Sequence, residues 1–83
     1  MDEAYRRQIE QRIREDRIAL LREAEPERTA LIESMYADFV ALAEGIEDPQ
    51  RREVELREAA RVLDDALDNL IQEGISAIRR EFG

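Results

Sequence analysis

The sequence predicts an all-helical protein: an antiparallel hairpin or bundle of three helical segments, at about residues 2–24, 26–44 and 49–82, in a single domain spanning residues 1–83. Three observations lead to this prediction. Apolar residues recur at spacings of three and four over most of the chain. Both prolines and one glycine fall between the periodic stretches, where such residues begin and end helices. Charged residues make up 41% of the 83 residues and apolar residues 43%, a mixture that suits amphipathic helices better than disorder.

The first segment, residues 2–24, has an uneven apolar face. Asp2 can cap it, because a short carboxylate accepts hydrogen bonds from the unpaired N–H groups of a first turn. A pair of charged residues, Asp16 and Arg17, interrupts the apolar rows of this segment. We interpret the pair as flanking the seam with its charges turned outward, and the alternative is that it fixes register or partner choice. The apolar residues form a thin row followed by a wider one: Tyr5, Ile9 and Ile13, then Ile18, Leu20, Leu21 and Ala24.

Residues 25–28, Glu-Pro-Glu-Arg, form one fully polar turn between the first two segments. Pro26 fits the first position of the second helix. The junction lacks Gly, Asn, Asp and Ser, the residues that usually reverse a chain, so we expect a kink that lets the first segment continue along the third. The alternative left open is a reversal at Pro26, which gives a three-helix bundle. The apolar end of the third segment then projects, with Ile71, Ile75, Ile78 and Phe82 uncovered.

The second segment, residues 26–44, has the broadest apolar face of the chain. Because one neighbouring helix cannot cover so wide a face, we expect the rest of the chain to pack around this segment. Phe39 lies at the centre of the face, and Phe39→Ala is expected to cost about 3–5 kcal/mol. Gly45 is placed to end the helix in the left-handed conformation, and Asp48 to cap the next helix.

The third segment begins at Pro49 and keeps a spacing of three and four through Leu56, Ala60, Leu63, Leu67 and Leu70. Gly74 can end this helix or lie within it. The apolar residues stay in phase across the glycine, while a glycine inside a helix costs only about 1 kcal/mol. We therefore expect one continuous helix to residue 82.

Self-association is expected because the apolar stripes exceed what one small chain can bury. A domain of this length is marginal alone, and the chain has no cysteine for disulfides. A hairpin with one open face can pair with a second copy to form a four-helix bundle, so a homodimer or larger assembly is predicted. The residues expected in the core or at this contact are Ile32, Met35, Phe39, Leu42, Leu63, Leu67, Leu70, Ile71, Ile75 and Ile78.

Charge restricts the partners. The net charge of −8 argues against nucleic acid and anionic membranes. Residues 23–48 hold one arginine against eight acidic residues, and Glu33, Asp38 and Glu44 are a possible face for a basic protein partner. The chain starts with no signal-peptide core and contains no apolar run near the roughly 20 residues of a membrane span, so a cytoplasmic protein is expected.

Groups suited to catalysis are scarce. Without histidine or cysteine, the usual nucleophile–base pairs and metal ligands are missing. The spaced carboxylates of Glu55, Glu58, Asp65 and Asp68 resemble the acidic magnesium motifs of all-α nucleotide pyrophosphohydrolases, in which such pairs lie on facing helices. Here both pairs fall on one helix, so we interpret them as a solvated face and expect no enzyme activity, cofactor or metal.

The function that these features favour is that of a small, acidic, non-enzymatic helical protein acting through protein–protein interaction, as an adaptor, assembly factor or regulator. The alternative is an acidic inhibitor that occupies a basic, nucleic-acid-binding surface of another protein. A second alternative is a secretion-type hairpin subunit or cargo, because the chain resembles type III secretion needle subunits in length and hairpin layout.

Overall fold

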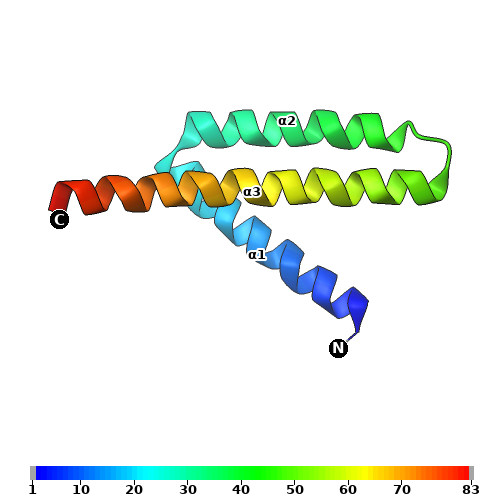
Figure 1. Cartoon of the computed structure of the whole chain (residues 1–83), viewed down its shortest axis with the longest axis horizontal. Helices are drawn as coiled ribbons and strands as arrows, with labels where there is room; N and C mark the ends of the chain where they lie inside the picture. Colours follow the sequence, from blue (N-terminus) through cyan, green and yellow to red (C-terminus); the bar gives the residue numbers. More distant parts are fainter. Residues whose placement is uncertain (1, 83) are drawn as a thin grey trace.

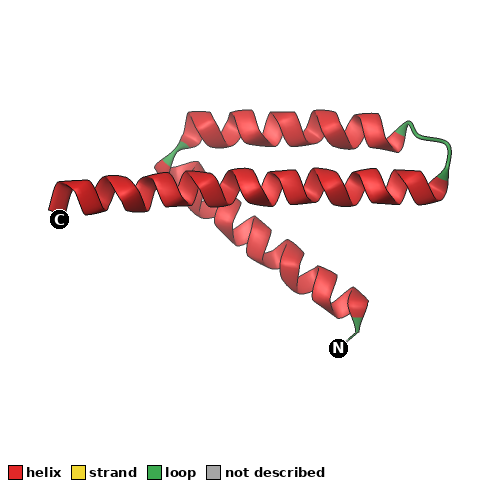
Figure 2. Cartoon of the chain, viewed as in Figure 1, coloured by secondary structure: helices red, strands yellow, loops and turns green. Residues whose placement is uncertain are grey.

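The computed structural model describes residues 2–82, which form three helices: α1 (Glu3–Ala24), α2 (Pro26–Glu44) and α3 (Pro49–Phe82). The helices are joined by short connections, and residues 2–82 contain no strand (Figure 2). The prediction of an all-helical chain with three segments is confirmed, and the bounds of α2 and α3 are those expected from the sequence. Within these residues, no helix is both long and apolar enough to span a lipid bilayer.

The helices are arranged as an antiparallel hairpin of α2 and α3 crossed obliquely by α1 (Figure 1). The C-terminal end of α1 meets the hairpin, and the N-terminal part of α1 diverges from it. The molecule measures 51 × 31 × 18 Å, and its radius of gyration is 15.1 Å. A compact chain of this length has a radius of gyration of about 12 Å, so the fold is open and elongated.

Two helix starts have the predicted caps. The side chain of Asp2 accepts a hydrogen bond from Ala4 N at 3.2 Å, and the side chain of Asp48 accepts one from Gln50 N at 3.1 Å. The left-handed cap predicted at Gly45 is wrong, because this residue has φ −77° and ψ −6°. α2 instead ends in a tighter turn, in which the N–H of Gly45 donates to the carbonyl oxygen three residues earlier at 3.2 Å. Such a turn satisfies the carbonyl without a left-handed residue.

The chain reverses at Glu25, so the favoured kink at Pro26 is wrong and the three-helix alternative is correct (Figure 1). Glu25 leaves the helical region, with φ −138° and ψ 69°. The carbonyl oxygen of Leu21 accepts hydrogen bonds from Glu25 N at 2.7 Å and from Thr29 Oγ1 at 3.0 Å. Thr29 is fully buried, so its hydroxyl joins the last turn of α1 to the first turn of α2.

The core lies where all three helices meet. It is built from Leu21 of α1 and Leu63, Leu67 and Leu70 of α3, with Ile18, Ile32, Tyr36 and Ile71 packed against it. α3 therefore supplies the centre of the core, which differs from the expectation that the chain packs around α2. Phe39 remains 45% exposed, because it lines grooves between α2 and α3 that no residue of α1 borders.

α3 runs without a break through Gly74, as the apolar phase predicted. Its last turns extend past the junction of α1 and α2 (Figure 1). Ile75, Ile78 and Phe82 are exposed there, in agreement with the projecting end expected for a three-helix bundle. Ile71 does not project, because it packs against the core.

Candidate functional site

An uncovered apolar groove runs between α2 and α3, and we call it the hairpin face. Large side chains line the groove on α2, whereas the side chains that line it on α3 are small. The alanines of α3 leave room for the backbone of another helix to come close. The residues of the hairpin face are Ile32, Met35, Phe39 and Leu42 of α2, Ile46 of the loop that follows, and Ala59, Val62 and Ala66 of α3.

The hairpin face is on the side of the hairpin away from α1. Val62 and Asp64 are two residues apart on α3, and each residue turns a helix by about 100°, so the two side chains point to nearly opposite sides. Asp64 binds Arg14 of α1, whereas Val62 lines the groove. α1 therefore covers one side of the hairpin and leaves the hairpin face open.

The ten residues predicted for the core or for self-association fall in three places. Leu63, Leu67 and Leu70 are in the core, and Ile32 and Ile71 are half-buried against it. Met35, Phe39 and Leu42 are exposed on the hairpin face, and Leu42 is 74% exposed. Ile75 and Ile78 are exposed on the projecting end of α3. The sequence pattern identified apolar residues without separating those that one chain buries from those it leaves uncovered.

The exposed area of the chain is large for its mass. The accessible surface is 6770 Å², about 1,600 Å² more than the roughly 5,100 Å² expected for a compact monomer of 9.7 kDa. Large apolar side chains on α1, the hairpin face and the end of α3 are exposed and contribute to this surface. A contiguous group of exposed apolar side chains marks an interaction site.

The three acidic residues of the possible partner face do not share one side of α2. Glu33 is bound by Arg22 of α1 at 2.9 Å, and among residues 2–82 Asp38 and Glu44 form no ion pair. Asp38 precedes Glu44 by six residues, so the two side chains are separated by about 120° around the helix. Glu33 and Glu44 lie on the same side.

Ion pairs hold the N-terminal part of α1 to α3. Arg14 donates two hydrogen bonds to Asp64, at 2.7 and 2.9 Å, and Arg7 lies 3.3 Å from Glu53. The hydrogen bonds to Asp64 raise the pKa of Arg14 above its ordinary value, although partial burial opposes the shift. Glu10 lies four residues before Arg14 in the sequence, a spacing that favours a pair within α1. The contact with Asp64 was missed because no local spacing signals it.

Two of the four spaced carboxylates of α3, those of Glu58 and Asp65, are engaged by arginine. Arg61 pairs with both Glu58 and Asp65, and its hydrogen bond to Glu58 lowers the pKa of that carboxyl. Within the described part of the chain, no three acidic side chains gather closely enough to hold a metal ion. These carboxylates can therefore act as a solvated charged surface.

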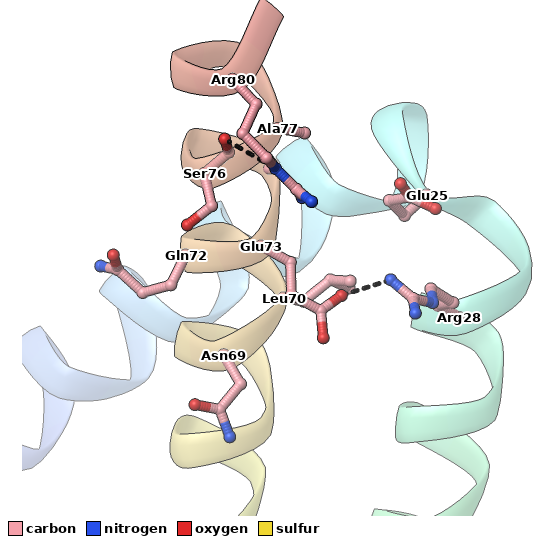
Figure 3. Close-up of a pocket in the computed structure, with 10 residues that line it drawn as sticks. Glu25, Arg28, Asn69, Leu70, Gln72, Glu73, Ser76, Ala77 and Arg80 are labelled. Atoms are coloured by element: carbon pink, nitrogen blue, oxygen red, sulfur yellow. Dashed lines mark hydrogen bonds and ion pairs between the residues drawn. The ribbon is translucent and has the colours of Figure 1, made fainter.

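A polar hollow lies at the junction end of the hairpin (Figure 3). Arg28 reaches across it to Glu73, and Arg80 donates to the carbonyl oxygen of Ser76. Glu25 also lines the hollow, so the charges there are mixed. Neither a phosphate cradle nor a nucleophile and base result from this arrangement.

Comparison with known protein families, curated proteins and solved structures finds no match to this chain.

Proposed function

We propose that this chain is a non-enzymatic helical protein that acts through protein–protein contact, and that a second copy covers its hairpin face. The open hairpin face is the observation that carries the proposal. Its apolar side chains follow the spacing of a helix that packs on other helices, yet α1 lies on the opposite side of the hairpin. The role that follows is that of an adaptor, assembly factor or regulator.

The size of the open surface supports a second copy as the occupant. Two hairpins packed face to face form a four-helix bundle, in which α2 and α3 of each copy bury the apolar sides of the other. A stable protein interface removes about 800 Å² from each partner. The excess of about 1,600 Å² over a compact monomer is large enough for such a contact.

The alternative of an acidic inhibitor has less support. An inhibitor of a basic surface needs a continuous acidic face that the partner can approach. Glu33 is already paired with Arg22, and Asp38 is turned away from Glu44. The hairpin face itself is apolar, with only Glu55 and Glu58 lining one of its grooves.

The proposal is tested with Leu42→Glu and a matched control, Val54→Glu. Both parent side chains are exposed, Leu42 by 74% and Val54 by 59%, so neither change disturbs the core. Only Leu42 lies on the hairpin face. Because a carboxylate replaces a leucine buried on association, Leu42→Glu is expected to weaken dimerisation by about tenfold or more, while Val54→Glu leaves it unchanged.

Sedimentation equilibrium between one and several hundred micromolar measures both variants and the parent. Circular dichroism checks that each variant keeps its helix content. A parent chain that stays monomeric throughout this range contradicts the proposal. Equal dimerisation of the two variants assigns the contact to another surface.

A further inference from the structure

α1 carries a second uncovered apolar row, on the side that faces away from α3. Tyr5, Ile9, Ile13 and Leu20 are between 38% and 64% exposed. The opposite side of α1 faces the rest of the molecule through Arg7, Arg14, Ile18 and Leu21. The outward row is therefore unused within one copy.

The outward row has the spacing of a coiled-coil seam. One charged residue precedes its two central isoleucines and another follows them. Arg6, Ile9, Ile13, Asp16 and Leu20 follow one another at intervals of three and four residues. Among residues 2–82, Arg6 forms no ion pair, and Asp16 has only a 3.8 Å contact with Arg12 in which both side chains are exposed. Within this range the two charges are thus without a close ion-pair partner, and Arg6 lies at the edge of the row, where it also borders the hollow between α1 and α3.

We propose that this row docks in antiparallel orientation on α1 of a second copy, with Ile9 against the partner's Ile13. Arg6 is three residues before Ile9 and Asp16 is three residues after Ile13, so this register brings Arg6 opposite the partner's Asp16. The two-fold symmetry repeats the ion pair at the other end of the seam. Ile9 and Ile13 of both copies form the apolar layers between the two pairs.

Charge selects this orientation. In a parallel pair, Arg6 lies against the partner's Arg6 and Asp16 against the partner's Asp16, so that like charges meet at both ends. In the antiparallel pair the charges at the seam positions are complementary. A polar residue at a seam position sets the register of a coiled coil, which gives the interruption of the apolar row by Asp16 a function.

The inference rests on the proposed function in taking the partner to be the same chain, and it adds a second surface. The α1 row and the hairpin face lie on opposite sides of the molecule, so one bound copy leaves the other surface free. Two different two-fold contacts build assemblies larger than a dimer. The two contacts are tested separately when Leu42→Glu removes the hairpin face.

Cysteine cross-linking tests the register, because the native chain has no cysteine. In the Leu42→Glu background, Ile9→Cys is mixed with a size-tagged Ile13→Cys chain and oxidised mildly. The antiparallel register predicts disulfides mainly between the two different variants. Homodimeric products in equal or greater amount overturn the register, and the absence of cross-linked product overturns the α1 contact, whatever Leu42→Glu shows about the hairpin face.

Charge reversal provides the second test in the same background. Arg6→Asp and Asp16→Arg are each expected to weaken association about tenfold, since the two-fold places the altered pair twice in the contact. The double variant restores the pair with reversed polarity and is expected to recover most of the parent affinity. Arg79→Asp, at the far end of α3, controls for the change in net charge. A double variant no better than the single variants overturns the Arg6–Asp16 pairing.

Discussion

The two ends of the α2–α3 hairpin differ in how well they are packed. At the junction end α1 lies against both helices, and Leu67 and Thr29 are fully buried. At the loop end α1 reaches α3 only through long charged side chains such as Arg7, which pairs with Glu53. Phe39 and Leu42 stay exposed there although their spacing is that of core residues. Two helices bury a seam but not a broad face, so burial in this chain depends on how closely α1 packs on the hairpin at each level.

The course of α1 accounts for the difference. Its apolar residues Ile18 and Leu21 are at the C-terminal end and pack on the core. Toward the N-terminus its contacts with α3 are made by Arg7 and Arg14, whose long side chains reach carboxylates across a wider gap. Ion pairs of this kind contribute little to stability when they are exposed. α1 therefore closes a core only over its last turns.

The largest expected effect is the difference in unfolding free energy lost when a large apolar residue is truncated at one end of the hairpin or at the other. Leu67→Ala is expected to cost about 2–5 kcal/mol of unfolding free energy, because it opens a cavity among Leu21, Leu63 and Leu70. Phe39→Ala, measured in the Leu42→Glu variant so that the hairpin face is uncovered, is expected to cost under about 2 kcal/mol, because much of this side chain is already in water. Urea unfolding followed by circular dichroism measures both. An equal or larger loss for Phe39→Ala refutes the contrast between the two ends.

A smaller effect is expected from the buried hydroxyl that fixes the reversal. Thr29→Val keeps the shape and the β-branching of threonine but removes the hydrogen bond to the carbonyl oxygen of Leu21. That oxygen keeps its bond from Glu25 N, so no buried group is left unpaired. We expect a loss of about 0.5–1.5 kcal/mol, measured by urea unfolding. A variant as stable as the parent means that packing alone, without the hydroxyl, holds the junction end together.

The elements of the fold could be predicted from the sequence because their signals are local. Asp2 and Asp48 are helix caps, Pro26 and Pro49 are first helical residues, and the apolar phase across Gly74 gives a continuous α3. The reversal at Glu25 could not be predicted, since it depends on Thr29, which bonds to a carbonyl oxygen eight residues earlier. The sequence offers one indirect signal of the reversal. It is a threonine in the first turn of a helix that follows another helix closely.

The candidate site was only half predictable. The residues of the hairpin face follow from helical spacing, and Met35, Phe39 and Leu42 were identified in this way. Their exposure depends on which side of the hairpin α1 takes, and that is decided by contacts such as Arg14 with Asp64, fifty residues apart. The outward row of α1 was visible in the sequence as a thin stripe, but its isolation from the core required the structure.

The smallest expected effect concerns the part of α3 that extends past the junction end. A Cβ added at Gly74 meets no atom within 4 Å, and the residue lies in a continuous helix. Alanine there restricts the unfolded chain and favours the helix, which is worth about 0.5–1 kcal/mol. The thermal midpoint of Gly74→Ala is therefore expected to rise by a few degrees.

Gly45→Ala is the matched control for this substitution. Gly45 is also right-handed, but it lies at the end of α2, where an added Cβ contacts the carbonyl oxygen of Leu42 at 3.4 Å. Because Gly45 lies just beyond α2, alanine gains little helix propensity there, and we expect a change of only a few tenths of a kcal/mol. Thermal unfolding followed by circular dichroism measures both variants. A lower midpoint or a loss of helix in Gly74→Ala indicates that the projecting end bends at the glycine, so that Ile75, Ile78 and Phe82 fold back toward the core instead of extending beyond it.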